Sequence, residues 1–197
     1  LHRQQPDNPN MAFQLAISLR AIGDPGAAES HVERVIATRP KKVSAQILHI
    51  NLALDHGDLD AALHRVDAAL VHQPDALGLR RKRAVVLRRF GRHHEACALF
   101  IKLHAENPDN LDMAFQLAIS LRAIGDPDAA ESHVERIIAA TPKKSLAQGL
   151  YVDLALDRSN PEAALQRVDA ALNHKPNDVV LQRKRAGVLR RLGRHHD

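Results

Sequence analysis

The sequence contains few aromatic residues and almost no cysteine. Aromatic residues make up 3% of the 197 residues and none is Trp, whereas 45% are hydrophobic. A core must therefore be built from Ala, Leu, Val and Ile, which favours closely packed helices over sheets. The only cysteine, Cys97, excludes a disulfide within the chain and is consistent with a reducing compartment. We therefore expect a cytoplasmic protein.

Long hydrophobic runs are also missing. No apolar run approaches the roughly 20 residues that a helix needs to cross a bilayer, and no signal peptide is visible. We expect no membrane partner. The chain begins at Leu1 rather than Met, so we expect a segment of a longer protein. The formal net charge of +5 is a modest excess, which favours acidic partners without indicating a nucleic-acid-binding protein.

Motifs of catalysis and cofactor binding are missing as well. There is no glycine-rich phosphate-binding loop and no G-x-S-x-G turn. No two of the 13 histidines are four residues apart, the spacing that puts two metal ligands on one helix face. The sequence therefore predicts no enzyme, no cofactor and no metal site. We interpret the following as turn or packed helix residues: His31, His93, His94, Cys97, His133, His195 and His196.

What the sequence does contain is a period of 34 residues. A fixed period with glycine and proline at constant phases indicates a repeat architecture. The recurring positions are Pro6, Pro40, Pro74, Pro108, Pro142 and Pro176; Gly23, Gly57, Gly91, Gly125 and Gly193; and Ala28, Ala62, Ala96, Ala130 and Ala164. Ser159 occupies the one position that is missing from the glycine series.

Each 34-residue unit is predicted to form two helices. Apolar residues follow a helical spacing before Gly23, which ends the first helix. Asp24 suits the N-cap of the next helix and Pro25 its first position, and Pro40 closes the unit. The same pattern predicts helices near 10–22, 25–38, 43–56, 59–72, 77–90, 93–105, 111–124, 127–140, 145–158, 161–174 and 178–192.

A second period of 102 residues, or three units, lies above the first. Residues 11–95 and 113–197 are identical at 59 of 85 positions, whereas neighbouring units match far less. We interpret the chain as an array that grew by copying blocks of three units. Neither end carries a visibly polar capping helix, so we expect a longer array and a tendency to self-associate end to end.

Two helices per 34 residues, small residues at fixed places and a closing proline resemble the tetratricopeptide repeat. The resemblance covers the whole chain and implies an all-α fold, a right-handed superhelical solenoid of antiparallel helix pairs. The repeats would be 9–42, 43–76, 77–110, 111–144, 145–178 and a partial repeat 179–197. Matched small residues are Ala16, Ile50, Ala84, Ala118, Val152 and Ala186 in first helices, and the alanine series above in second helices. Matched large residues are Val32, Val66, Phe100, Val134 and Val168.

Two positions depart from the family pattern, and they predict looser packing between the first helices. The early aromatic of the first helix is replaced by Ala12, Gln46, Arg80, Ala114, Gln148 and Gln182. The next apolar position is polar at His49, Arg83 and Arg185.

The resemblance also implies that the first helices line a concave groove that binds a protein or peptide. The expected groove residues are Phe13, Ile17, Arg20, Ile47, Asn51, Leu54, Asp55, Arg81, Val85, Arg88, Arg89, Phe115, Ile119, Arg122, Gly149, Asp153, Leu156, Asp157, Arg183, Gly187, Arg190 and Arg191. The basic runs 80–89 and 182–191 favour an acidic peptide, because arginine binds carboxylates in a planar, bidentate way. Alternatively they are solvated charges, partly neutralised by Asp55 and Asp157. Phe13 and Phe115 either dock an apolar side chain or pack between helices.

Three functions fit this surface. The first is a non-catalytic scaffold for protein–protein interaction, and the second is the targeting or substrate-recruiting arm of a larger enzyme such as a transferase. The third is nucleic-acid binding through the basic helices, although their only aromatic residue for stacking is Phe90. A chaperone-type carboxylate clamp is not supported, because Ile47 stands where that clamp needs Lys. The Ala and Arg content favours a bacterial source.

Overall fold

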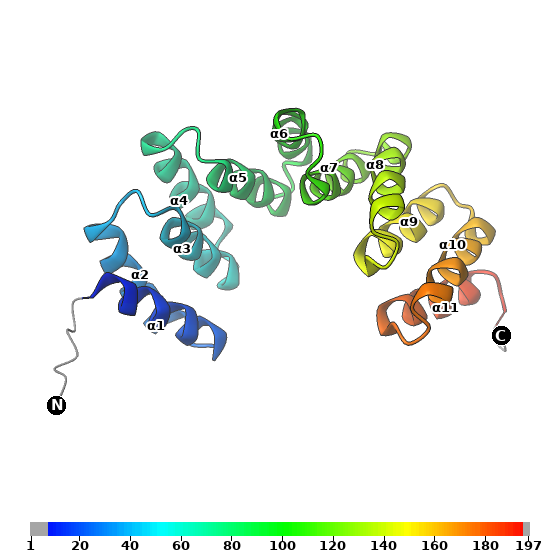
Figure 1. Ribbon diagram of the computed structural model, residues 1–197, viewed down its shortest axis with the longest axis horizontal. Coiled ribbons are helices and arrows are strands. Elements are labelled where there is room, and N and C mark those ends of the chain that lie inside the picture. The colour runs from blue at the N-terminus through cyan, green and yellow to red at the C-terminus, as the bar shows by residue number, and fades with distance from the viewer. Residues whose placement is uncertain (1–7, 195–197) are drawn as a thin grey trace. The chain divides into compact units, whose positions relative to one another are not determined.

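The structure is a computed structural model that describes residues 8–194, and its regular elements there are all α-helices (Figure 1). The helices of this part of the chain are α1 (Pro9–Ala21), α2 (Pro25–Thr38), α3 (Val43–Asp55), α4 (Leu59–His72), α5 (Leu77–Arg89), α6 (His93–Glu106), α7 (Leu111–Ala123), α8 (Pro127–Ala140), α9 (Ser145–Asp157), α10 (Pro161–His174) and α11 (Val179–Arg191). Every predicted helix is present, with ends that agree to within one residue. The predicted all-helical class is confirmed, while His195 and His196 lie outside the described residues.

Recurring cap residues explain where the helices begin and end. Asp24 accepts a hydrogen bond from the backbone N–H of Ala27 (3.0 Å) and so satisfies a donor at the start of α2. Gly23 ends α1 with a φ of +85°. Ser159 stands at the equivalent turn after α9 and has a φ of +55°, in the left-handed region that favours glycine.

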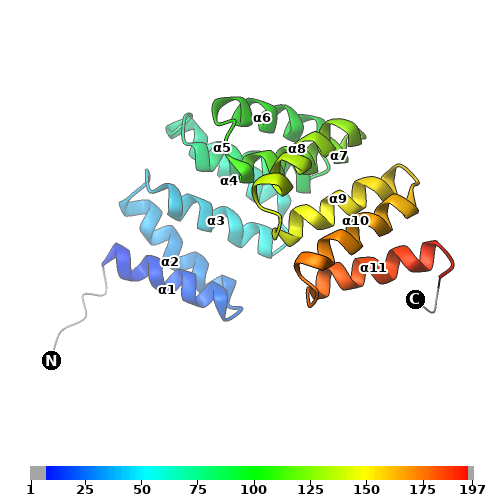
Figure 2. The ribbon, with the colours of Figure 1, turned by 45° about the vertical axis from the view of Figure 1, so that its right-hand side comes forward.

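The chain divides into two compact units, which are described separately. The first unit ends at Leu99 and the second begins at Phe100, within α6. In the first unit each helix from α1 to α5 packs against the next, and α3 also contacts α1 and α5 (Figure 2). In the second unit α7 to α11 repeat this arrangement around α9. Each unit therefore has one layer of odd-numbered helices and one of even-numbered helices.

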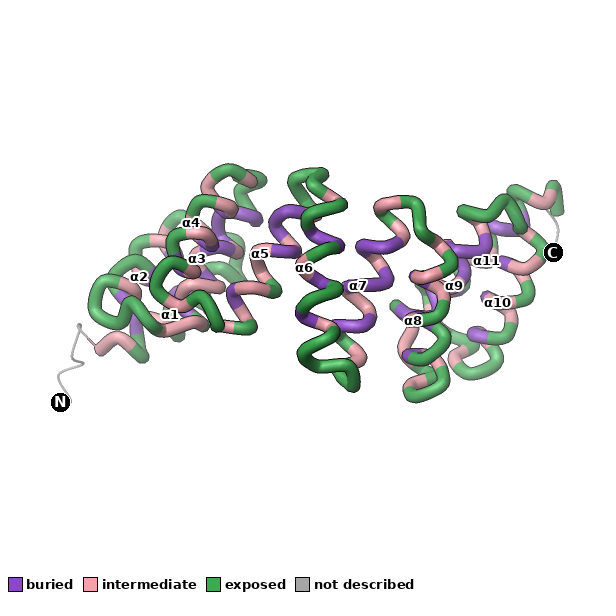
Figure 3. Tube along the Cα trace, turned by 90° about the horizontal axis from the view of Figure 1, so that it is seen from above, coloured by how far each residue is buried: buried purple, intermediate pink, exposed green. Residues whose placement is uncertain are grey.

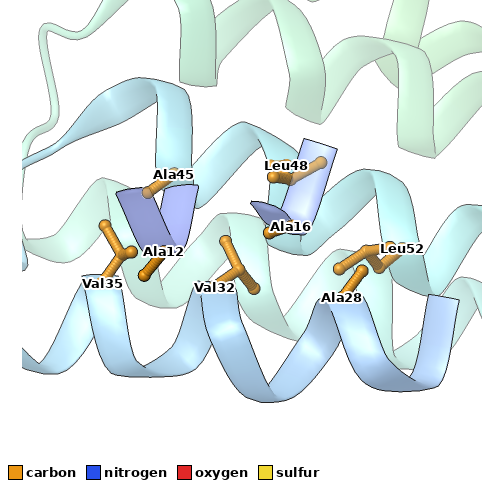
Figure 4. Close-up of a cluster of buried hydrophobic side chains, with 8 residues drawn as sticks. All are labelled: Ala12, Ala16, Ala28, Val32, Val35, Ala45, Leu48 and Leu52. Atoms are coloured by element: carbon orange, nitrogen blue, oxygen red, sulfur yellow. The ribbon is translucent and has the colours of Figure 1, made fainter. Parts of the chain in front are cut away.

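The core of each unit lies between these layers, where the buried stretches of neighbouring helices face one another (Figure 3). Between α1, α2 and α3 it consists only of Ala, Val and Leu side chains (Figure 4). Small residues allow the helix axes to approach closely, so a core with almost no aromatic residues still packs. This cluster contains Ala12, Ala16, Ala28, Val32, Val35, Ala45, Leu48 and Leu52.

The core positions predicted from the 34-residue period are confirmed. All five matched alanines and all five matched large residues of the even-numbered helices are fully buried. The small positions of the odd-numbered helices are also buried, except for Ala186 in α11, which is exposed. Cys97 is buried, in agreement with its interpretation as a packing residue.

Hydrogen bonds occupy the positions where the family has an early aromatic residue. The side-chain amides of Gln46, Gln148 and Gln182 each donate to the carbonyl of the proline six residues earlier, at 3.0, 3.0 and 2.8 Å. Each glutamine thus ties the start of an odd-numbered helix to the end of the preceding turn. The missing ring is replaced by a specific contact, which the prediction of looser packing did not include.

Candidate functional site

The layer of odd-numbered helices carries hollows in both units, and predicted groove residues line them. In the first unit Ile17, Arg20 and Asp55 line a hollow of about 380 Å³ between α1 and α3. Arg81 and Val85 line a second one, of about 230 Å³, between α3 and α5. In this unit the predicted residues therefore surround concave surface.

The second unit has corresponding hollows between α7, α9 and α11. One of about 310 Å³ is lined by Phe115, Ile119 and Asp153 together with residues of α11. Another, of about 510 Å³, is lined by Ile119, Arg122 and Asp157 and reaches the turn before α8. Groove candidates of α7 and α9 therefore line the same hollows, while Arg183 and Arg190 of α11 are exposed.

Ion pairs between odd-numbered helices join several of the predicted groove residues. The Arg20 guanidinium donates two hydrogen bonds to Asp55 of the next odd-numbered helix, at 2.5 and 3.2 Å. This bond lowers the pKa of Asp55 and raises that of Arg20. In the second unit Arg122 donates in the same way to Asp157, at 2.5 and 3.0 Å, and also approaches Asp153.

These pairs change the expected partner of the acidic residues. The sequence allows Asp55 and Asp157 to act as partial neutralisers of the basic helices. Asp55 is instead held mainly by Arg20 of α1, although Arg89 of α5 also lowers the pKa of Asp55 by its charge. Most of the negative charge near the basic helix is therefore already compensated by another arginine.

The basic helices α5 and α11 present arginines with different surroundings. Arg81, Arg183 and Arg190 are exposed and form no ion pair with any residue in 8–194. Arg88 is half-buried, and burial together with the neighbouring charge of Arg89 lowers its pKa. The exposed arginines are available to a carboxylate outside the chain.

Two lysines of the groove were not among the predicted site residues. Lys82 of α5 donates to the side-chain carbonyl of Asn51 at 2.7 Å, and Lys184 of α11 forms an ion pair with Asp153. Burial lowers the pKa of Lys82, as do the charges of nearby arginines. Each lysine immediately follows a predicted groove arginine in the sequence. Its place in the groove becomes visible only through its contact with a residue 31 positions earlier, on the preceding odd-numbered helix.

Phe13 and Phe115 are partly buried and contact a lysine of the following turn. The Nζ atom of Lys42 lies 4.1 Å from the ring centre of Phe13, and that of Lys144 lies 5.6 Å from Phe115. Both rings pack against the core of their unit. Each ring therefore packs against the helices on one side. Phe115 also lines the hollow between α7, α9 and α11.

A cluster of titratable residues between α2, α3 and α4 was not predicted. The Nε2 atom of His49 lies 3.5 Å from a carboxylate oxygen of Glu29 and 3.8 Å from one of Glu33. The three groups have the donor types of a metal site. However, Arg65 forms an ion pair with Glu29 and donates to the backbone carbonyl of His49 at 2.8 Å. A cation already occupies this cluster.

The second unit builds the same contact with a different residue. Tyr151 takes the place of His49 and donates to Glu135 at 3.0 Å. Arg167 pairs with Glu131 and donates to the carbonyl of Tyr151 at 2.8 Å. Tyr151 thus replaces His49 in the second unit. The contact that both units share is the arginine that bridges neighbouring repeats.

No helix within residues 8–194 combines the length and the apolar character that spanning a membrane requires.

Two family models match the chain. A model described as tetratricopeptide repeat matches residues 47–110, and another with the same description matches residues 87–154. Together they span more than half of the chain. The chain belongs to the tetratricopeptide repeat family.

Several solved structures share the fold over most of their length. The type IV pilus biogenesis factor PilW has a TM-score of 0.81 at 19% identity, with 94% of this chain and 86% of PilW covered. A thermophilic repeat protein from Thermus thermophilus has a TM-score of 0.74 at 20% identity, with 92% and 99% covered. YrrB, described as having an unusual peptide-binding site, has a TM-score of 0.65 at 16% identity, with 91% and 93% covered.

At these identities the likeness concerns the fold. A search of curated proteins finds no match for the chain. The tetratricopeptide repeat fold is nevertheless one that presents an interaction surface for proteins or peptides.

Proposed function

We propose that this tetratricopeptide repeat array is a non-catalytic scaffold that binds an extended, partly acidic peptide or protein segment along its odd-numbered helices. One observation carries the proposal. Arg81, an exposed arginine without an ion pair in residues 8–194, lines a hollow with apolar walls in the first unit, and Arg183 and Arg190 are exposed and without an ion pair in the same residues on the corresponding helix of the second.

The chemistry of these surfaces favours an acidic partner. A guanidinium group binds a carboxylate with two parallel hydrogen bonds, and its fixed charge suits a negatively charged chain. The formal net charge of +5 attracts the same kind of partner over longer distances. YrrB, which shares the fold, is described as having a peptide-binding site. The 102-residue period offers the surface twice, which suits a long or repetitive partner.

Charge reversal at the arginines tests the proposal. The probe is a fluorescein-labelled peptide of alternating Glu and Ala, titrated with the protein and followed by fluorescence anisotropy. We expect the double variant Arg81→Glu and Arg183→Glu to weaken binding at least about tenfold, because two charge-assisted contacts are lost. The control reverses the exposed Lys102 of α6 and Lys143 of the turn before α9, which changes the net charge equally.

An equal loss in the two double variants would mean that only net charge matters, and no loss in either would remove the groove assignment. A single-stranded oligonucleotide in the same titration separates the nucleic-acid alternative. Binding of the oligonucleotide but not of the peptide, with an affinity that falls steeply as salt is added, would favour that alternative.

A further inference from the structure

The two units differ at a pair of groove positions that exchange a large and a small residue. The first unit has Ile47 on α3 and Gly78 on α5. The positions 102 residues later hold Gly149 on α9 and Val180 on α11. The branched residue is thus on the earlier helix in the first unit and on the later helix in the second, and the other member of each pair is glycine.

In the first unit this arrangement fills the space between α3 and α5. A Cβ atom built on Gly78 would lie 3.1 Å from Cδ1 of Ile47 and 3.4 Å from Cγ1 of Val43. The isoleucine therefore packs directly over the backbone of α5. The hollow that remains beside it measures about 230 Å³ and is lined only by residues of these two helices.

In the second unit the stem of Lys184, and not a branched apolar side chain, lies over Gly149, because a Cβ atom built on Gly149 would lie 2.9 Å from Cε of Lys184. The hollow there measures about 310 Å³ and continues across three helices, from Phe115 and Ile119 on α7 to Val180 on α11. Leu146 of α9 forms another apolar wall. Leu146 is 64% exposed and Val180 49% exposed, so their apolar surface is uncovered.

One edge of this hollow is charged. Lys184 forms an ion pair with Asp153, and Arg122 donates to the same carboxylate at 3.3 Å. Arg122 also donates two hydrogen bonds to Asp157, so these two cations are matched by two carboxylates of α9. The exposed Arg183 adds a further positive charge on α11.

We propose that the hollow lined by Phe115, Ile119, Leu146, Gly149 and Val180 is a specificity pocket for one bulky apolar side chain, Phe or Leu, of a peptide with acidic residues beside it. Its volume is at the lower limit of ordinary ligand pockets, which suits a single side chain. In the first unit Ile47 stands at the position of Gly149 and packs over Gly78. This inference rests on the proposed function and assigns the anchoring side chain to the second unit.

The test uses two peptides that differ at one residue. Their sequence is Ser-Gly-Asp-Glu-X-Asp-Glu-Gly-Ser, with X either Phe or Ala, and binding is measured by isothermal titration calorimetry. Burying a phenylalanine ring removes a large apolar area from water, so we expect the Phe peptide to bind about tenfold or more tightly than the Ala peptide. We expect one such site per chain.

Two variants give the second unit the residues of the first. The double variant G149I/V180G restores the filled arrangement and should abolish the preference for Phe while retaining binding of the Ala peptide. An isoleucine at position 149 requires the flexible end of Lys184 to shift, because a Cβ atom there would lie 2.9 Å from Cε of Lys184. In the first unit Lys82 reaches Asn51 on the same helix as Ile47. The variant L146S introduces the residue present at Ser44 on an exposed surface, and it should reduce the preference several-fold without affecting folding.

The outcomes separate this inference from the proposed function. If neither peptide binds, the proposed function itself is wrong. If both bind equally tightly to the unmodified protein, or if G149I/V180G and L146S keep the full preference for Phe, the acidic scaffold stands and the pocket does not. Thermal unfolding followed by circular dichroism verifies that each variant is folded.

Discussion

At Ser159 a residue with a side chain adopts a backbone conformation that the other turns of this kind give to glycine. Left-handed φ costs a non-glycine residue roughly 1–2 kcal/mol. Part of the gain from removing this cost is offset by the greater freedom of glycine in the unfolded chain. We therefore expect Ser159→Gly to raise the free energy of unfolding by about 0.5–1 kcal/mol, measured by urea denaturation.

The matched control for this substitution is Gly125→Ser, at the equivalent turn after α7, where φ is +84°. This change introduces the strain that Ser159 carries and should lower the free energy of unfolding by a similar amount. A variant Ser159→Gly that is no more stable than the original protein would show that the turn tolerates serine without cost.

His49 makes the stability of the first unit depend on pH. Its side chain faces Glu29, Glu33 and Arg65, and burial followed by the charge of Arg65 lowers its pKa, against the opposing effect of the two carboxylates. The unfolded chain takes up the proton first as the pH falls, because its histidine keeps the ordinary pKa of about 6.5. Folding stability is therefore full above that value and decreases as the pH falls below it.

We expect the free energy of unfolding, measured by urea denaturation, to decrease between about pH 7.5 and about pH 5.5, and to decrease less in His49→Tyr. Tyrosine is the residue of the second unit at this place, and it stays neutral over this range. Burial and nearby Arg136 also lower the pKa of His104 and His133, so part of the pH dependence should remain in the variant. An unchanged pH dependence in His49→Tyr would contradict the assignment.

At the scale of a helix and its neighbours, α2 is held by a small core that it shares with α1 and α3. Val32 of α2 is fully buried in that core. Removing two buried methyl groups costs about 2 kcal/mol. In a repeat array each repeat contacts only its neighbours, so the effect should remain local.

We expect Val32→Ala to raise amide hydrogen exchange in α1 to α3 and to leave α9 to α11 unchanged, as measured by mass spectrometry. The reciprocal variant Val168→Ala, at the same position of α10, should do the opposite. If either substitution raised exchange equally along the whole chain, the protein would unfold as one cooperative body.

The elements that could be predicted from the sequence depend on residues close together in the chain. Gly23, Asp24 and Pro25 define a helix boundary by themselves, and the alanine series identifies the buried face of each even-numbered helix. The contacts that could not be predicted join residues one repeat apart. Arg20 and Asp55 are 35 residues apart, and a spacing in sequence does not say which of several nearby charges will pair.

The groove shows the same division. The positions that line it were predicted from the family pattern, and Ile17, Arg20 and Asp55 do surround a hollow. The difference between the units was not predicted. Ile47 and Gly78 are replaced by Gly149 and Val180 in the second unit, and the sequence alone does not show that the two positions contact each other. Only the structure shows that Ile47 occupies the space beside Gly78, where a Cβ atom built on the glycine would lie 3.1 Å from Cδ1 of Ile47.

Across the whole molecule, the two units are built from nearly the same residues and yet offer different surfaces. Residues 11–95 and 113–197 share 59 of 85 positions, including the core alanines and core valines such as Val32 and Val66. Several of the differences lie on the odd-numbered helices, at the positions of Ile47, Asn51, Gly78 and Val85. Changes there leave the even-numbered layer intact, so the surface can diverge while the fold is kept.

The contact between Arg167 and Tyr151 has a practical consequence for spectroscopy. Tyr151 is the only tyrosine and the chain has no Trp, so excitation of tyrosine reports almost solely on α9. The centre of its ring lies 3.7 Å from the guanidinium carbon of Arg167, and its hydroxyl donates a hydrogen bond to Glu135. The emission of this tyrosine will therefore follow the melting of the second unit alone, whereas far-ultraviolet circular dichroism records the helices of both, and a comparison of the two signals reveals without any label whether the units melt together.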